Sequence, residues 1–357
     1  MKIFHCDNCQ QLVFYENIQC VQCGHALAYL PDREAMAALE PAGDGLWRQA
    51  KAEQKHAYRL CRNYSKENVC NWAVPAQDTN PLCRSCRLTR VIPDLGKPGN
   101  PEAWYRLEAA KRRLVYTLLG LDLPLANKID DPEHGLAFEF LADPEGGGAP
   151  VLTGHDGGVI TINVAEADDA EREKRRLAMH EPYRTLLGHF RHEIGHYYWD
   201  RLIRDSDRID AFRERFGDER QDYNQALQLH YSQGAPADWA DRFISAYASA
   251  HPWEDWAETW SHYLHMVDTL ETANGCGLTL RPQRRDEPAL KPNLVLRGCR
   301  PESFECMIND WYPLTYVLNC LNRGLGLGDS YPFVIPPPAI EKLRFVHDAI
   351  GANRDVY

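Results

Sequence analysis

The chain has 357 residues, of which 44% are hydrophobic and 25% are charged, and its net charge is −11. This composition predicts a globular protein of two or three domains, and the acidic balance argues against non-specific binding to nucleic acid. No apolar run reaches the roughly 18 residues of a membrane span, and the chain does not open on a hydrophobic signal region. We therefore expect a cytoplasmic protein that does not enter a membrane.

Two Cys-x-x-Cys pairs near the start of the chain predict a zinc site. Cys6 and Cys9 form the first pair, and Cys20 and Cys23 form the second. Each pair predicts a tight knuckle, and two knuckles supply four thiolates for one tetrahedral zinc ion. Because four thiolates close the coordination sphere, we expect this ion to be structural.

A second group of four cysteines comprises Cys61, Cys70, Cys83 and Cys86. Only the last two have the knuckle spacing, since nine positions separate the first two. We expect the four thiols to hold a second structural zinc ion. Free buried thiols, or a ligand supplied by His56, are the alternatives.

Charges are unevenly distributed over this cysteine-rich part of the chain. Residues 1–45 hold two Lys or Arg against six Asp or Glu, whereas residues 46–97 hold ten against four. The basic stretch is either a docking surface for an acidic partner or nucleic acid, or a face that is solvated or packed against the acidic remainder of the chain. We favour the second interpretation. The ribbons are still a candidate surface for a protein partner.

A linker rich in proline and glycine at residues 92–101 predicts a domain boundary. We expect a double zinc-ribbon region over residues 1–97, with the first ribbon at 6–23 and the second cysteine cluster at 61–86. The remainder, residues 98–357, is expected to form a second, catalytic domain.

The second domain is predicted to be α+β. Apolar residues from Trp104 to Leu118 recur at helical spacing, and Asn100 is the expected cap of that helix. Three segments are predicted to be strands, namely 136–141, 151–153 and 158–164. After residue 171 the pattern is almost entirely helical, so a small mixed sheet is followed by helices. The segment 158–164 is the clearest strand and is expected to pair with an extended peptide.

The HExxH motif, in which His192 and His196 enclose Glu193, is the strongest sign of chemistry. Apolar residues at helical spacing, with Pro182 in the first turn, predict a helix here. On a helix the two imidazoles lie one turn apart on one face and share a metal ion, while Glu193 lies on the flank of that face. A helix with two incidental histidines is the alternative. His189 is a rival ligand, which we expect to lie in the core or beside the ligands.

A catalytic zinc ion needs a third protein ligand. The metzincin arrangement requires glycine where this chain has Trp199, followed by a third histidine, so that arrangement is excluded. A second helix is predicted from Pro252 onward, with a tryptophan-rich apolar stripe at helical spacing. Glu254 and Glu258 lie four residues apart on another face of it, and we favour a role at the metal over an exposed acidic face.

These motifs resemble the gluzincin branch of zinc metallopeptidases, in which E-x-x-A-E on a second helix follows HExxH. The resemblance implies that Glu254 is the third zinc ligand and that Glu258 hydrogen-bonds a ligating histidine. Lethal-factor-like members place a tyrosine seven residues before the ligand glutamate, which implies that Tyr247 stabilises the oxyanion. A packed aromatic residue is the alternative for Tyr247.

Most of the chain resembles a narrower group, the bacterial zinc-binding metallopeptidases with an N-terminal zinc-ribbon region. The matching stretches are Cys6–Cys23, Cys70–Trp72, Cys83–Leu88, His192–Asp200 and His251–Ala273. The resemblance implies a zincin-like fold and hydrolysis of a peptide bond in a protein or peptide substrate. We expect one catalytic and two structural Zn²⁺ ions, with Glu193 as the general base. The alternatives are a zinc-ribbon binding module with an inactive protease-like domain, and a metal hydrolase of non-peptide amides.

Four further cysteines have no metal-ligand spacing, namely Cys276, Cys299, Cys306 and Cys320. We expect them to be buried free thiols, because cysteine is among the most frequently buried residue types. A disulfide framework is not expected in a reducing cytoplasm.

Overall fold

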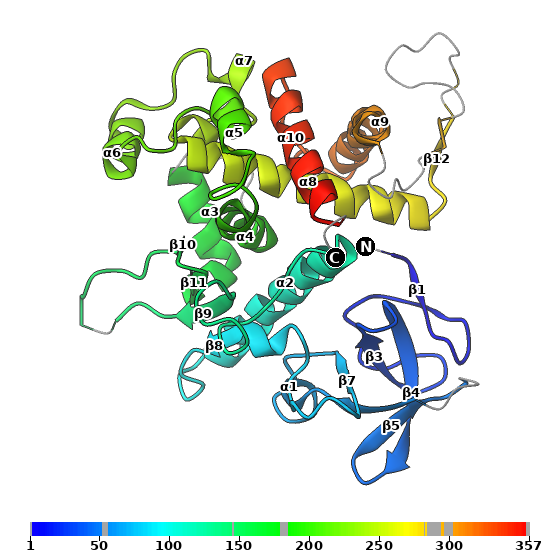
Figure 1. Ribbon diagram of the computed structural model, residues 1–357. Helices are drawn as coiled ribbons and strands as arrows, with labels where there is room; N and C mark the ends of the chain where they lie inside the picture. Colours follow the sequence, from blue (N-terminus) through cyan, green and yellow to red (C-terminus); the bar gives the residue numbers. More distant parts are fainter. Residues whose placement is uncertain are drawn as a thin grey trace. The chain divides into compact units, whose positions relative to one another are not determined.

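The computed structural model describes most of the chain. The described residues are 2–51, 56–144, 146–178, 185–281, 283, 294–295 and 303–354. They form two compact units (Figure 1). The ribbon unit contains Lys2–Leu119 and Leu125–Arg172, and the helical unit contains Gly120–Pro124 and Glu173–Tyr357.

The ribbon unit begins with short antiparallel strands. β1 (Phe4–His5) pairs with β2 (Leu12–Val13), and a separate antiparallel sheet has the order β3-β4-β5-β6-β7. The strands of that sheet are β3 (Ala26–Leu30), β4 (Ala35–Gly43), β5 (Leu46–Gln49), β6 (Ala57–Leu60) and β7 (Ala73–Pro75). Short helices accompany the strands of this unit, namely α1 (Arg62–Ser65), η1 (Cys86–Leu88) and η2 (Val164–Ala167).

An aromatic cluster fills the centre of the ribbon unit. The Tyr15 ring centroid lies 5.3 Å from that of Tyr29 and 5.5 Å from that of Tyr116. Trp72 is fully buried and its Nε1 donates to the Tyr15 hydroxyl at 2.8 Å. Since Tyr15 comes from the first ribbon and Trp72 lies beside the second cysteine cluster, the burial of these rings ties the two metal-binding segments into one core.

The helix α2 (Asn100–Gly120) is the predicted amphipathic helix, and its apolar stripe is buried. The prediction that Asn100 caps it is wrong. The Asn100 side-chain amide donates to the Asp94 carbonyl at 2.8 Å, and the first helical bond runs from the Ala103 N–H to the Gly99 carbonyl at 2.9 Å. The Asn100 side chain, which was expected to cap the helix, therefore stabilises the turn of the linker instead.

A small mixed sheet completes the ribbon unit. Its strands lie in the order β10-β11-β9-β8, with β10 antiparallel to β11 and the other pairs parallel. They are β8 (Thr89–Val91), β9 (Ala137–Leu141), β10 (Gly154–Asp156) and β11 (Val159–Asn163). This sheet takes strands from both sides of the boundary expected at residue 97. With the helices that follow, it gives the predicted α+β fold class.

The strands predicted at 136–141 and 158–164 are present as β9 and β11, but the strand predicted at 151–153 and the peptide pairing predicted for 158–164 are wrong. Residues 151–153 form no strand, because side chains satisfy the backbone there: the Val151 N–H donates to Asp143 Oδ1 at 2.7 Å, and the Val151 carbonyl accepts from Asn163 Nδ2 at 3.0 Å. Nor is the strand at 158–164 available to an extended peptide. β11 has β10 on one edge and β9 on the other, so its backbone groups are already paired.

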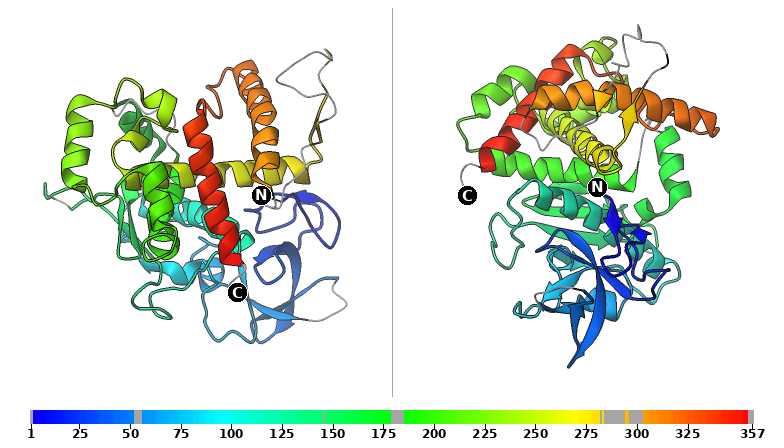
Figure 2. Two further views of the ribbon diagram at one scale, coloured as in Figure 1. Left: turned by 45° about the horizontal axis from the view of Figure 1, so that its top comes forward. Right: turned by 90° about the vertical axis from the view of Figure 1, so that its right-hand side faces the viewer.

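The helical unit is built around α8 (Pro252–Gly275), which contacts α4, α5, α9 and α10 (Figure 1 and Figure 2). The remaining elements are α3 (Asp169–Ala178), which crosses from one unit to the other, α4 (Leu186–Leu202), α5 (Ile209–Phe216), α6 (Tyr223–Gln233), α7 (Trp239–Arg242), η3 (Tyr247–Ser249), β12 (Thr279–Leu280), β13 (Leu294–Val295), α9 (Phe304–Gly324) and α10 (Pro337–Arg354). Across the described residues, no helix combines the length and hydropathy that a bilayer span requires.

The two helices with the predicted motifs have well-defined starts. Thr185 Oγ1 accepts from the Gly188 N–H at 3.0 Å and so caps α4. His251 caps α8, and Pro252 is its first residue, as the sequence predicts. Pro182, which was expected in the first turn of the HExxH helix, lies outside the described residues.

α4 and α8 pack closely at Gly195. A Cβ atom at this position would lie 3.0 Å from the Cα of Ala257 and 3.2 Å from the Cβ of Trp260, so a larger residue would push the two helices apart by a few tenths of an ångström. Trp256 Nε1 donates to the Gly195 carbonyl at 2.8 Å. The predicted apolar stripe is buried at Trp256, Ala257 and Trp260. This packing brings the histidines of α4 beside the carboxylates of α8.

The prediction of buried free thiols is wrong for Cys276, Cys306 and Cys320, which are exposed. Cys276 follows the end of α8, and the other two lie off the buried stripe of α9. That stripe includes Phe304, Met307, Ile308, Trp311 and Leu314. A cysteine on a helix is buried only where the helical spacing places it on the face that packs against the core. Cys299 lies outside the described residues.

Candidate metal centres

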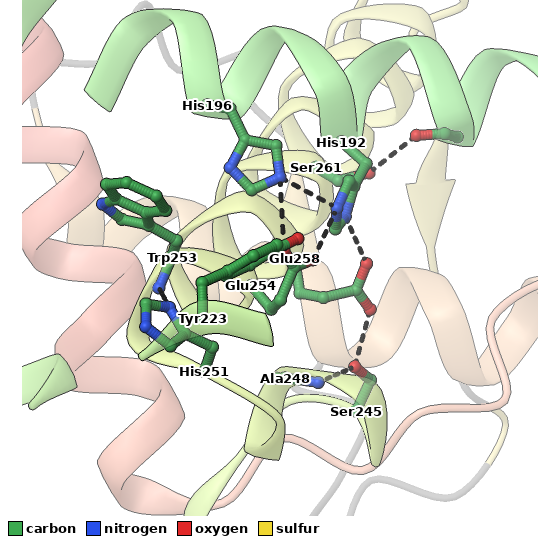
Figure 3. A network of polar contacts seen from close by, with 11 residues as sticks. His192, His196, Tyr223, Ser245, Ala248, His251, Trp253, Glu254, Glu258 and Ser261 are labelled. Atoms are coloured by element: carbon green, nitrogen blue, oxygen red, sulfur yellow. Dashed lines mark hydrogen bonds and ion pairs between the residues drawn. The ribbon is translucent and has the colours of Figure 1, made fainter. Parts of the chain in front are cut away.

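Two histidines and a glutamate converge in the helical unit (Figure 3). The ligand atoms of His192, His196 and Glu254 all lie within 4.8 Å of one another. The two Nε2 atoms are 3.3 Å apart, and Glu254 places Oε2 at 3.0 Å from His192 Nε2 and Oε1 at 3.6 Å from His196 Nε2. The structure thus brings together the three ligands predicted for a third metal ion. The rival ligand, His189, is not part of this group.

The two carboxylates, Glu254 and Glu258, set the charge at this point. Burial disfavours protonated His192, but its hydrogen bonds to Glu254 and Glu258 outweigh burial and raise its pKa well above the ordinary value. Burial lowers the pKa of His196 to about 4, so this imidazole is neutral. Burial also opposes ionisation of Glu254, yet the two imidazoles hold its pKa at about 2. Two imidazole nitrogens and an anionic carboxylate are a donor set typical of zinc.

Glu258 orients one of the two imidazoles. His192 Nδ1 lies 2.8 Å from Glu258 Oε1, and Ser245 Oγ donates to Glu258 Oε2 at 2.6 Å. A carboxylate that accepts the Nδ1 proton leaves Nε2 directed at the point where the ligand atoms meet. Glu258 therefore lies where the sequence predicts an orienting carboxylate. Ser245 was not predicted, since no spacing rule connects a residue in this loop with α8.

The Glu258→Gln variant is expected to lose roughly 10–100-fold in zinc affinity at this centre or in activity, because an amide is a poorer acceptor for the Nδ1 proton. Ser245→Ala should have a smaller effect, since Glu258 keeps its bond to His192. Competition with a chelator measures both affinities. Glu271→Gln, further along α8, is the matched control, and an equal loss in that variant would contradict the orienting role.

Glu193 and Tyr247, the predicted catalytic residues, both lie near residues of this group. Glu193 is buried on α4. It is close enough to affect Tyr223, whose pKa is raised first by burial and then by the charges of Glu254 and Glu193. Tyr247 lies on η3 with its ring centroid 5.9 Å from that of His192. Burial raises the pKa of Tyr247 well above its ordinary value, so its hydroxyl keeps its proton and remains a donor.

Two further side chains were not predicted, one at the site and one between the helices that carry it. Tyr223, on α6, donates its hydroxyl proton to Glu254 Oε1 at 2.7 Å. Arg191, buried on α4, contacts His265 and pairs with Asp268, both on α8. The sequence offers one clue to Arg191, since it is a charged residue next to HExxH in a helix whose pattern is otherwise apolar. Tyr223 belongs to a separate helix and has no such signal.

The cysteines of the first ribbon meet in the ribbon unit. Their ligand atoms all lie within 4.8 Å of one another, and they are Cys6, Cys9, Cys20 and Cys23. The second knuckle closes where the Gly24 N–H donates to the Cys20 carbonyl at 2.8 Å, with a φ of 74° at Gly24. Glycine adopts this left-handed conformation without strain, and the turn directs both sulfurs of the pair to one point.

The cysteines of the second cluster also meet, and each is at most 3% exposed. They are Cys61, Cys70, Cys83 and Cys86. Backbone amides point at the sulfurs: the Cys83 N–H lies 3.3 Å from Cys61 Sγ, and the Trp72 N–H lies 3.4 Å from Cys70 Sγ. Burial and the neighbouring thiols raise the pKa of Cys83 well above its ordinary value. Four thiolates are therefore stable together only around a cation, and His56 is not part of the group.

Arg112 supplies a compensating positive charge beside the second cluster. Burial opposes its ionisation, but Cys70, Glu108 and Cys86 outweigh that effect and raise its pKa. Four thiolates around a zinc dication carry a net charge of about −2. A buried guanidinium offsets part of that charge, which explains a buried cation at this point of α2.

The chain is similar to known proteins along its whole length. Residues 100–349 match the family described as "Putative zinc-binding metallo-peptidase", and residues 3–97 match the family described as "zinc-ribbon domain". Three relatives are each 44% identical over 351 residues, which cover 98% of this chain and 95% of the relative. They are the uncharacterized proteins Rv2568c and MT2644 of Mycobacterium tuberculosis and Mb2598c of Mycobacterium bovis. No solved structure matches the chain.

The family matches confirm the resemblance to the zinc-binding metallopeptidases, with a ribbon region first and a metallopeptidase region after it. The two groups of four cysteines and the zinc-ribbon match together identify a zinc-binding N-terminal region. Because the longer match spans well over half of the 357 residues, the chain belongs to the "Putative zinc-binding metallo-peptidase" family and carries an N-terminal zinc-ribbon domain.

Proposed function

We propose that the chain is a gluzincin-type zinc peptidase whose ion is held by His192, His196 and Glu254, with Glu193 as the general base. The observation that carries this proposal is the convergence of three ligand atoms from two helices, within 4.8 Å of one another. The His192 contact with Glu258 supports it, because metal-binding histidines are usually oriented by such a partner.

The residues of the site suit hydrolysis of a peptide bond. Bound zinc supplies a Lewis acid that polarises the scissile carbonyl and makes water a stronger nucleophile near neutral pH. Glu193 accepts a proton from the attacking water and returns it to the leaving amine when the C–N bond breaks. The Tyr247 hydroxyl donates a hydrogen bond to the negative oxygen that develops on the carbonyl.

The two cysteine centres are proposed to be structural. Each has four thiolates, so no coordination position is left for a substrate. Stable thiolates require a reducing environment, which is why we place the protein in the cytoplasm. A protein or peptide is the proposed substrate, and the ribbons are the proposed surface for a protein partner.

Purified chain is expected to contain about three zinc ions, since there are three separate ligand groups. The double variant His192→Ala/His196→Ala should contain about two and should lose peptidase activity, because only the site in the helical unit loses its ligands. Elemental analysis gives the zinc content, and a library of labelled peptides gives the activity. Circular dichroism of the double variant controls for folding.

The same experiment separates this function from a pure binding role. Three zinc ions with peptide cleavage support the proposal. Two zinc ions in the unmodified chain, unaffected by the histidine substitutions and without cleavage, would identify a zinc-ribbon binding module with an inactive protease-like domain. Cleavage of non-peptide amides alone would point to another metal hydrolase.

A further inference from the structure

Tyr223 reaches the metal centre from a helix that carries none of the predicted ligands. It is the first residue of α6, and its hydroxyl donates to Glu254 Oε1 at 2.7 Å (Figure 3). The other carboxylate oxygen, Oε2, lies 3.0 Å from His192 Nε2. Oε2 therefore has His192 as its partner, whereas Oε1 accepts from the Tyr223 hydroxyl and also lies 3.6 Å from His196 Nε2.

Packing holds the Tyr223 ring in place. Its centroid lies 5.1 Å from that of His251, edge to face, and 5.9 Å from that of Trp253. His251 is itself fixed: Nδ1 accepts from the Trp253 N–H at 3.1 Å, so Nε2 carries the proton and donates to the Gln221 carbonyl at 3.3 Å. His251, which caps α8, thus also holds the backbone of Gln221, two residues before the start of α6. The packing of the ring therefore fixes the position of the Tyr223 hydroxyl.

Metal binding changes which donors Glu254 has. A ligating imidazole nitrogen presents its lone pair to the ion, so neither His192 Nε2 nor His196 Nε2 is then a donor to the carboxylate. The Tyr223 hydroxyl is not one of the three converging ligands, so it remains a donor to Oε1.

We infer that Tyr223 is a positioning residue that holds Oε1 of Glu254 and thereby makes Glu254 a one-oxygen ligand of the zinc ion. A carboxylate binding through both oxygens would occupy an additional coordination position. A catalytic zinc site has three protein ligands and keeps a position open for water or substrate. The hydrogen bond from Tyr223 would preserve that position. This inference rests on the proposed zinc site but is tested separately from it.

Tyr223→Phe removes only the hydroxyl and keeps the ring packed against His251 and Trp253. The full chain is treated with a chelator until the site in the helical unit is empty while the cysteine centres keep their zinc. Zinc affinity is then measured by chelator competition. Cobalt(II) is added in a parallel experiment, since its visible absorption reports coordination number. The absence of sulfur-to-cobalt charge-transfer bands shows that the cysteine centres have not exchanged.

Tyr223→Phe is expected to bind zinc roughly 10–100-fold more weakly and to give a cobalt spectrum of higher coordination number, with weaker visible bands. The matched control is Tyr316→Phe, the same change at a residue of α9 that is 57% exposed. It should keep both the affinity and the spectrum. In a Glu254→Gln background, Tyr223→Phe should add little to the loss, because the tyrosine acts through that carboxylate.

Unchanged zinc affinity and an unchanged cobalt spectrum in Tyr223→Phe would overturn the inference. So would a full additional loss in the Glu254→Gln background, since the hydroxyl would then act on something other than Glu254. Failure of the proposed zinc site looks different, because the unmodified chain would bind no metal beyond its cysteine centres.

Discussion

The Glu193→Gln variant is expected to keep its full zinc content and to lose roughly 10²–10⁴-fold or more in peptidase turnover. Glutamine preserves the size of the side chain but cannot accept the proton of the attacking water. Glu193 is not among the three converging ligands, so its loss should leave the ion in place. Elemental analysis and single-turnover cleavage, measured on one preparation, separate the two effects.

An exposed carboxylate provides the control for Glu193. Glu214→Gln, on α5, removes the same charge away from the converging ligands and should change neither quantity. Loss of zinc in Glu193→Gln would assign the residue to the metal, and retained turnover would remove it from the proposed reaction.

Glu254 and Glu258 should give different results from Glu193. Glu254→Gln replaces an anionic ligand by a neutral amide, so zinc content and turnover should fall together. Glu258→Gln should cause the milder loss of an orienting partner. If Glu258→Gln were the variant that emptied the site, the two carboxylates would have exchanged roles. The placement of Tyr247, which depends on counting back from Glu254, would then fail as well.

Local spacing explains why much of the site could be predicted. The four-residue separations of His192 from His196 and of Glu254 from Glu258 place each pair on one helical face whatever the rest of the fold does. The knuckle spacing of Cys6 and Cys9 is equally local. Predictions of this kind need only the helix or turn to form, and both α4 and α8 form.

The remaining parts of the site depend on tertiary contacts. Tyr223 reaches Glu254 from α6, and Ser245 reaches Glu258 from a loop, so no periodicity relates them to their partners. Gly195 could have been noticed inside HExxH, but its meaning depends on the close approach of α8. The backbone of residue 151 pairs with side chains of residues 143 and 163, which a strand pattern cannot reveal.

The two cysteine centres differ in their surroundings, and the difference predicts which is lost first. Cys9 and Cys23 of the first ribbon are partly exposed, whereas all four cysteines of the second cluster are buried. A thiol reagent must reach a sulfur before it can displace the metal. The first ribbon should therefore release its zinc before the second cluster, which opens only when the ribbon unit unfolds.

Cys61→Ser is expected to unfold the ribbon unit as a whole. A structural zinc site contributes on the order of 10 kcal/mol to folding, which is comparable with the total stability of a typical domain. The second cluster also lies beside Trp72, whose indole bonds Tyr15 in the aromatic core, so collapse of the cluster removes support from that core. Cys23→Ser, at the partly exposed ribbon, should melt a smaller segment.

Thermal unfolding followed by circular dichroism, with zinc counted before and after, compares the two variants. The zinc of the helical unit should remain in both, since its ligands are all on α4 and α8. If Cys61→Ser kept a folded ribbon unit but lost that zinc and the activity, these cysteines would have a catalytic role and not a structural one.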